Sequence, residues 1–134
     1  MRYALRDLSR EDAARAAGVP INTLDVWVHR YHVGGKRGSA RLFSPRDVAI
    51  IANARKLERA GLAVPEALRV LEQALHDPPE ADTILVIEDG QPRRVRGDFN
   101  LAASNAESVT CLWIGHIADH VISKLEAPRV AIQN

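Results

Sequence analysis

Three side chains near the end of the chain have the types and spacing of metal ligands: His116, Asp119 and His120, at i, i+3 and i+4. On a helix this spacing places two imidazoles and a carboxylate on one face, where they can bind a divalent metal ion. The same spacing also arises on the polar face of an ordinary amphipathic helix, and the sequence offers no further ligand nearby. We therefore expect no metal site and no other cofactor.

The single cysteine, Cys111, is the next candidate for chemistry. One cysteine excludes an internal disulfide framework and a multi-cysteine zinc site. Because it lies in a short apolar run of strand type, residues 109–113, we expect a buried, inert thiol rather than a metal or redox sensor. Trp27 and Trp113 could form an aromatic cage, but we expect Trp27 to pack in or beside a helical core and Trp113 to anchor the last helix.

No residue pattern typical of an enzyme is present. The glycine-rich run at 34–38 lacks the preceding strand and the Lys-Ser/Thr ending of a phosphate-binding loop. No Ser-His-Asp or Cys-His arrangement occurs either. No apolar run reaches the ~18 residues of a membrane span, and the first twelve residues carry charges where a signal peptide would be apolar. We expect a non-enzymatic, cytoplasmic protein.

The overall composition indicates one domain, or one small domain with an appendage. The chain has 134 residues, of which 46% are hydrophobic, enough for a real core. Its net charge of +1 is unevenly distributed: residues 1–76 hold 13 basic and 8 acidic side chains, whereas residues 77–134 hold 5 and 9. A basic first half joined to an acidic second half suggests an anionic partner for the first half.

The first half of the chain has the pattern of two short helices joined by a tight turn. Ser9 is a typical N-cap, with Asp12 three residues later, and Gly18 ends the first helix. A second helix follows over residues 20–32, where apolar side chains recur at i, i+3, i+7 and i+10, namely Ile21, Leu24, Val28 and Tyr31. The alanines of the first helix, Ala13, Ala16 and Ala17, allow the two helices to pack closely. This is a helix-turn-helix.

A hairpin and two more helices are predicted next. Three glycines among basic residues over 34–43 favour a flexible hairpin, or wing. Ser44 and Pro45 begin a third helix that ends near Gly61, and a fourth helix begins at Pro65 and runs through Leu75.

The second half changes character after Pro78 and Pro79, which mark a linker. Strands are predicted over 83–87, 91–96 and 109–113, with an Asp-Gly turn at 89–90, followed by a last helix over 114–125. The predicted fold class is therefore mainly α with minor β. It comprises a winged helix-turn-helix domain at 1–76 and a small α/β module at 77–134.

This order of elements resembles the MerR-type winged-helix family over about residues 5–75. The residues that carry the resemblance are Gly18, Val19, Thr23, Leu24, Trp27, the stretch 40–44, Asp47, Val48 and the break at 59–62. The resemblance implies a DNA-binding transcription regulator whose helix 20–32 lies in the major groove.

The resemblance also indicates which side chains would contact double-stranded DNA. On the helix these are Asn22, Thr23, Asp25, His29 and Arg30. Asparagine can pair with adenine, arginine with guanine, and threonine with a base edge or a phosphate. In the wing, Lys36, Arg37 and Arg41 would contact phosphates or the minor groove.

Two departures from the family pattern concern the DNA-binding half, one in the helix and one in the wing. The family usually has basic and aromatic residues where this chain has Asp25 and Val26. An aspartate repels phosphate unless it accepts from a cytosine amino group or braces a neighbouring arginine. The wing tyrosine of the family is Phe43, which retains the packing and loses the hydroxyl.

A further departure concerns dimerisation. Many MerR-type regulators continue into one long helix that pairs with its twin, whereas here a β-rich segment intervenes. We still expect a homodimer, because one short helix reads few bases. The expected contact is the acidic module, through the stripe Ile114, Ile117, Val121, Ile122 and Leu125. The alternative is that this stripe packs on the strands of its own chain.

Three functions remain in competition. The first is a sequence-specific regulator, in which the acidic module could also contact RNA polymerase or another protein. The second is an excisionase-like architectural protein that bends DNA. The third is a protein-interaction or ligand-sensing adaptor with secondary DNA binding.

Overall fold

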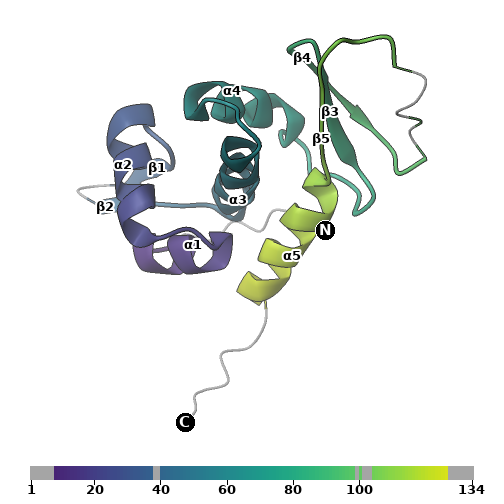
Figure 1. The fold of residues 1–134 in the computed structure, drawn as a ribbon. Coiled ribbons are helices and arrows are strands. Elements are labelled where there is room, and N and C mark those ends of the chain that lie inside the picture. Colours follow the sequence, from purple (N-terminus) through teal and green to yellow (C-terminus); the bar gives the residue numbers. More distant parts are fainter. Residues whose placement is uncertain (1–7, 38–39, 99, 101–103, 127–134) are drawn as a thin grey trace.

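The computed structural model describes residues 8–37, 40–98, 100 and 104–126, and for residues 35–37, 40, 41 and 126 only the backbone. In chain order the elements are α1 (Arg10–Ala17), α2 (Ile21–Tyr31), β1 (Gly35–Arg37), β2 (Ala40–Leu42), α3 (Pro45–Arg59), α4 (Val64–Ala74), β3 (Ile84–Glu88), β4 (Gln91–Val95), β5 (Val109–Leu112) and α5 (Ile114–Glu126). Figure 1 shows α3 at the centre, α2 and the wing on one side, and the three-stranded sheet on the other. The predicted fold class, mainly α with minor β, is confirmed.

The first two helices begin and end where the sequence indicated. The Ser9 hydroxyl accepts a hydrogen bond from the backbone N–H of Asp12 at 3.1 Å, which caps α1. Gly18 ends α1 in the left-handed conformation, with φ 72°. The helix expected over 20–32 is α2, with Pro20 and His32 as its caps.

The wing is a short antiparallel hairpin that is fixed at its base. In its ladder Gly35 lies opposite Leu42 and Arg37 opposite Ala40. At the base, Leu8 and Phe43 exchange two backbone hydrogen bonds of 2.8 and 3.0 Å. Gly34 has φ 87°, and a Cβ there would lie 2.6 Å from the Phe43 ring. Only glycine fits this position, since the ring is completely buried.

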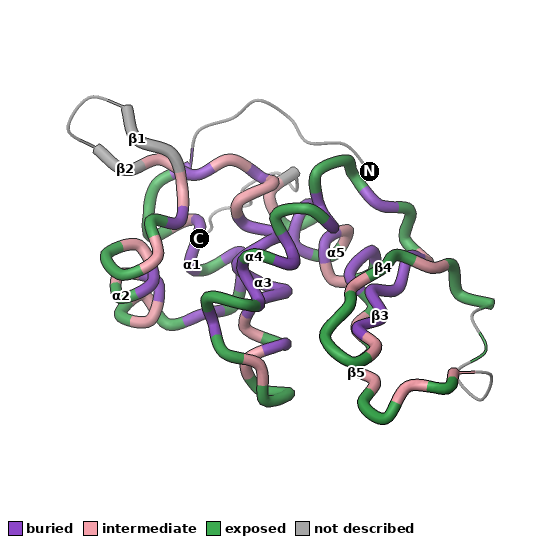
Figure 2. The backbone as a smooth tube through the Cα atoms, turned by 90° about the horizontal axis from the view of Figure 1, so that it is seen from above, coloured by how far each residue is buried: buried purple, intermediate pink, exposed green. Residues whose placement is uncertain are grey.

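Helix α3 is the centre of the core. Ser44 and Asp47 form a reciprocal capping box at its start. Nine of its fifteen residues are buried, too many for one amphipathic stripe, so α3 must be covered on most of its surface. It packs against α1, α4 and α5. Figure 2 shows the buried backbone concentrated along these helices and β3.

The C-terminal sheet is antiparallel, in the order β4-β3-β5. The predicted Asp-Gly turn connects β3 and β4: Asp89 and Gly90 have φ 49° and 82°, as a two-residue hairpin of type I′ requires. The Asp89 carboxylate accepts from the backbone N–H of Ser108 at 2.9 Å, which ties the turn to the segment before β5. The Glu88 carboxylate accepts from the Ser104 hydroxyl at 2.6 Å and from Arg93 at 2.8 Å.

Helix α5 closes the same core that the first four helices form. Ile114, Val121 and Ile122 are at most 4% exposed and belong to one hydrophobic cluster that also contains Leu8, Leu24 and Leu71. Ile117 and Leu125 are partly buried against that cluster. The stripe expected to pair two chains is therefore used inside the monomer. It packs mainly on α3 and α1 rather than on the strands.

Two side chains in this part differ from expectation. Cys111 is exposed rather than buried, although it lies opposite the buried Val86, because β5 is an edge strand and it is Leu112, opposite Leu85, that packs against the main core cluster. The Trp113 ring is 51% exposed, and Ile114, at 0%, anchors the helix instead.

Gly115 allows the segment before β3 to lie directly on α5. A Cβ at this position would fall onto the carbonyl oxygen of Glu80, and the Gly115 N–H donates to the carbonyl of Thr83 at 3.1 Å. We predict that Gly115→Ala lowers the free energy of unfolding by about 1–2 kcal/mol, because backbone rather than a flexible side chain must move. Urea unfolding measures this, with Gly97→Ala as the control, since the nearest atom there would be 3.6 Å away. Equal stability of the two variants would contradict the close approach.

The pKa of Glu88 lies below its ordinary value because the Ser104 hydroxyl and then the Arg93 guanidinium hydrogen-bond to the carboxylate. A lowered pKa in the folded state means that the charged form adds stability above the unfolded-state pKa, and that this stability is lost as pH falls. We predict that Glu88→Gln is less stable than the parent near neutral pH, and that the difference begins to shrink near the ordinary glutamate pKa of about 4.3 and is lost as pH falls further. Thermal unfolding across pH tests this. Glu107→Gln, which removes an exposed carboxylate without a partner among the described residues, is the control.

Candidate DNA-binding surface

Helix α2 has one face in the core and one in solvent. Leu24 and Trp27, at 0% and 3% exposure, fix the inner face, which confirms that Trp27 is a core residue. The exposed positions follow the helical repeat along the other face, namely Asn22, Val26, His29 and Arg30. Thr23 and Asp25 lie at the border and are half-buried. The predicted site residues of α2 thus form one surface, and Val26, 44% exposed, extends it.

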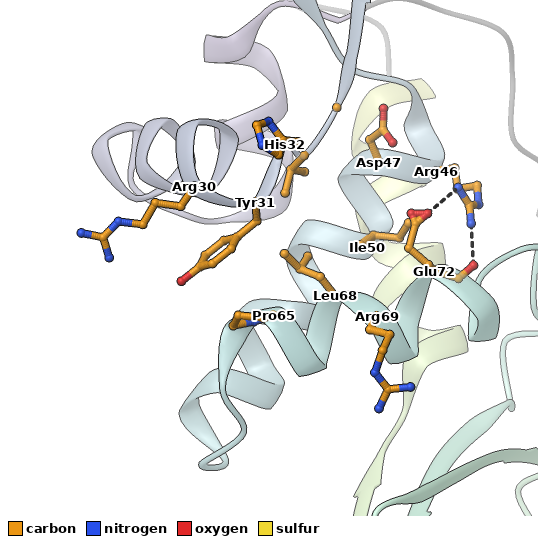
Figure 3. Close-up of a pocket in the computed structure, with 12 residues that line it drawn as sticks. Arg30, Tyr31, His32, Arg46, Asp47, Ile50, Pro65, Leu68, Arg69 and Glu72 are labelled. Atoms are coloured by element: carbon orange, nitrogen blue, oxygen red, sulfur yellow. Dashed lines mark hydrogen bonds and ion pairs between the residues drawn. The ribbon is translucent and has the colours of Figure 1, made fainter.

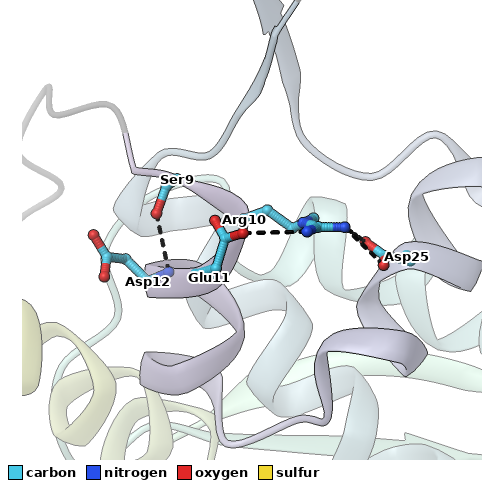
Figure 4. A network of polar contacts seen from close by, with 5 residues as sticks. All are labelled: Ser9, Arg10, Glu11, Asp12 and Asp25. Atoms are coloured by element: carbon cyan, nitrogen blue, oxygen red, sulfur yellow. Dashed lines mark hydrogen bonds and ion pairs between the residues drawn. The ribbon is translucent and has the colours of Figure 1, made fainter.

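Asp25 does not present a free carboxylate. The Nη1 atom of Arg10 on α1 donates to both of its oxygens, at 3.0 and 2.9 Å. The Nη2 atom of the same guanidinium donates to Glu11 at 3.1 Å, so that Arg10 lies between two carboxylates (Figure 4). Of the alternatives for Asp25, the bracing of a neighbouring arginine is the one realised here.

This cluster keeps Arg10 charged but carries a net charge of −1. The pKa of Arg10 is raised by its hydrogen bonds to Glu11 and Asp25. The pKa of Glu11 is lowered, first by a hydrogen bond from its own backbone and then by Arg10. With two carboxylates beside one guanidinium, the border of α2 repels phosphate more than its lone arginine attracts it. A ligand that displaced Asp25 would free the Nη1 atom of Arg10, while Nη2 would still donate to Glu11.

The start of α2 offers a different kind of contact. Its N-cap is Pro20, which supplies no side-chain hydrogen bond to the helix. The first backbone N–H groups of α2 are therefore open toward an anion, and the helix dipole favours negative charge at this end. A phosphate beside Pro20 would bring Asn22 close to the bases.

For most of the wing, the structure describes the backbone alone. Lys36 lies directly opposite Arg41 in the β1–β2 ladder. The side chains of Lys36, Arg37 and Arg41 lie outside the described residues, so their contacts with DNA remain sequence-based predictions.

A hollow of about 680 Å³ separates the end of α2 from α3 and α4 (Figure 3). On its α2 wall, Arg30 extends outward and Tyr31 points toward Pro65. On the opposite wall, Arg46 donates to the backbone carbonyls of Leu75 at 2.9 Å and Glu72 at 2.6 Å. These bonds satisfy the last turn of α4 and hold it to the start of α3.

Sequence reasoning missed two residues of the surface. Val26 interrupts the polar face and was noted only as a departure, although an apolar side chain in a major groove can contact the thymine methyl group. Arg10 lies fifteen residues before Asp25, and neither spacing nor periodicity links them. The unexplained charge of Asp25 was the signal that a cationic partner existed.

Two helices joined by a tight turn, a two-stranded wing and two further helices define a winged helix-turn-helix protein. Residues 8–74 match the family of MerR HTH family regulatory proteins. The match covers half of the chain, which therefore belongs to this family of non-enzymatic, DNA-binding transcription regulators. No curated protein matches the chain.

Two other properties concern the described part of the chain alone. It contains no group of three or more His, Cys, Asp or Glu side chains placed to hold a metal ion. No helix within it is long and apolar enough to cross a membrane.

The charge cluster at the border of α2 makes a prediction about affinity. Asp25→Asn should strengthen binding to random duplex DNA several-fold at low salt, because the cluster loses its net negative charge and the Nη1 atom of Arg10 loses its carboxylate partner. The slope of log K against log salt should steepen by about 1. Fluorescence anisotropy over a series of salt concentrations measures both quantities.

Glu11→Gln is the matched control. It also removes one carboxylate from Arg10, but the residue that changes lies on α1 instead of α2. It should change affinity in the same direction. If Asp25→Asn instead weakens binding while Glu11→Gln strengthens it, Asp25 itself contacts a base, and the bracing role is wrong.

Proposed function

We propose that the protein is a cytoplasmic, sequence-specific transcription regulator that binds double-stranded DNA as a homodimer. In this proposal α2 lies in the major groove, and the wing contacts the backbone or the minor groove. The observation that supports it most directly is the outer face of α2. Asn22, Val26, His29 and Arg30 are exposed there, while Leu24 and Trp27 hold the opposite face.

The side chains on this face are suited to bases as well as to phosphates. Asn22 can form two hydrogen bonds with an adenine and Arg30 two with a guanine. Arg30 has no carboxylate partner within the described residues, so its charge is not already neutralised. Val26, between them on the helix, suits a thymine methyl group. A chain that bound DNA only through its phosphates would not need this mixture.

The dimer follows from the size of the recognition element. An α2 of eleven residues reaches only a few base pairs, and a second copy doubles the site. Because the α5 stripe lies largely in the monomer core, of its five residues only Ile117 and Leu125, which are partly exposed, remain candidates for a contact with a second copy. Contact of the acidic half with RNA polymerase or another protein is a separate part of the proposal.

The test is in vitro selection from random duplex DNA. We expect a motif with two related halves. Asn22→Ala should relax the preference at one position of each half and cost about 1–3 kcal/mol there. Arg41→Ala should weaken binding to all sequences alike and lower the salt slope by about 1.

Arg96→Ala is the matched control, because Arg96 is an exposed arginine directly after β4 that pairs with Asp82 at 2.8 Å. It should select the parent motif. Failure to enrich any motif, with binding that disappears as salt rises, would refute sequence-specific regulation and favour the architectural, DNA-bending role. A single, unpaired half-site would refute the dimer.

A further inference from the structure

A groove of about 410 Å³ runs between the end of α1, the second half of α3 and α5. It lies away from the recognition helix: in both Figure 1 and Figure 2, α3 stands between α2 and α5. A straight duplex on the outer face of α2 therefore leaves this groove uncovered. The family match ends at residue 74, so the α5 wall of the groove belongs to the part of the chain outside that match.

The rim of the groove is basic. Among the described residues that line it there is no carboxylate, and the ionisable ones are Arg55, Lys56, Arg59, His116, His120 and Lys124. Arg55 pairs with Glu58 at 2.9 Å. Lys56, Arg59 and Lys124 are exposed and have no ion-pair partner among the residues that the structure describes.

This distribution is unequal across the molecule. Within the described side chains, the other arginines bond to carboxylates or backbone carbonyls. Among these described side chains, Arg30 on α2 is the exception, and the other cations without an ion-pair partner, Lys56, Arg59 and Lys124, line this groove. Like charges gathered without counter-ions cost energy in the free protein and favour an anionic partner.

The floor of the groove is apolar. Ala16, Ala17, Ala52 and Val121 are buried beneath it, so its accessible apolar surface comes mainly from Ile117, which is partly exposed. A second hollow, of about 480 Å³, shares Lys56, His116 and Ile117 with the groove and continues it to Leu112 and Trp113. The groove therefore leads to an aromatic side chain that is 51% exposed. Half-exposed tryptophans are typical anchors of protein interfaces.

We propose that this surface, from Trp113 to Lys124, binds an acidic amphipathic segment of a partner protein. Phosphate groups of DNA would match the cationic rim but gain nothing from an apolar floor or from Trp113. An amphipathic helix with acidic side chains along its edges matches both features, because its apolar face can cover Leu112, Trp113 and Ile117 while its carboxylates meet the rim. The site is independent of α2, so such a partner can bind while DNA is bound.

The test uses a fluorescein-labelled peptide of about 20 residues with leucines at i, i+3, i+4 and i+7 and glutamates between them. We expect saturable binding by anisotropy and a blue shift of Trp113 emission, because Trp27 is buried and already shielded. A peptide of the same composition with the leucines dispersed should bind at least about tenfold more weakly. The triple variant Lys56→Glu, Arg59→Glu, Lys124→Glu should lose at least about tenfold in affinity for the amphipathic peptide.

Arg30→Glu is the matched control. It reverses the charge of Arg30, the cation outside the groove that has no ion-pair partner among the described side chains. It should weaken duplex DNA binding and leave peptide binding unchanged, whereas the groove variant should do the opposite. Circular dichroism checks folding, and Lys56→Gln with Arg59→Gln replaces the reversals if these unfold the chain. The emission shift should be absent in Trp113→Phe, and its persistence there would refute the proposed anchor.

Three results would overturn the proposal. If the amphipathic and the dispersed peptides bind with equal affinity, the groove attracts acidic peptides through charge alone. Weaker DNA binding by the groove variant, as large as that of Arg30→Glu, would assign the groove to DNA. If the parent protein self-associates in sedimentation and the groove variant does not, the occupant of the groove is a second copy of this chain.

Discussion

The burial of α3 is the constraint on which the other elements depend. Val48, Ile51 and Leu57 are fully buried on different sides of this helix, and each contributes about 1.5–3 kcal/mol relative to exposure in water. No single neighbour can cover all of these sides. Helix α1 covers one, α4 another and α5 a third. Even a polar residue lies within this packing: Asn53 is completely buried and donates to the carbonyl of Ala49 at 2.9 Å.

This interior also determines how α2 is presented. Among the helices α2 packs chiefly on α1, whose buried face consists of alanines. Small side chains bring α1 close to α3, and α2 is then held at a short distance by Leu24 and Trp27. The orientation of the outer face of α2 is therefore set by an inner face that contains only two large buried residues. The start of α2 is further tied to α1 through Arg10 and Asp25 at the surface, where the interaction affects charge more than stability.

Features with a local cause could be predicted from the sequence. Ser9, Gly18, and Ser44 with Asp47 specify helix ends through hydrogen bonds or backbone conformation within a few residues. Asp89 and Gly90 specify their turn in the same way. The helical repeat was sufficient to find the outer face of α2, because burial of Leu24 and Trp27 follows from their types and spacing.

Features that depend on distant parts of the chain could not be predicted in this way. The apolar stripe of α5 required a partner surface, and nothing within 114–125 distinguishes a second chain from the uncovered side of α3. Cys111 lies in an apolar run, but its exposure depends on the strand order, which places β5 at an edge. The Arg10–Asp25 pair depends on the angle between two helices rather than on either sequence.

The place of α5 in the core has a consequence for how the chain is made. The helix that covers α3 is synthesised last among the described elements, about forty residues after the end of α4. Since domains fold as their residues leave the ribosome, the nascent DNA-binding half must wait with part of its central helix open to solvent. Arrested or truncated translation products that stop before Ile114 would carry a complete recognition helix on an unfinished core. Such products would be substrates for chaperones and proteases rather than competitors for DNA.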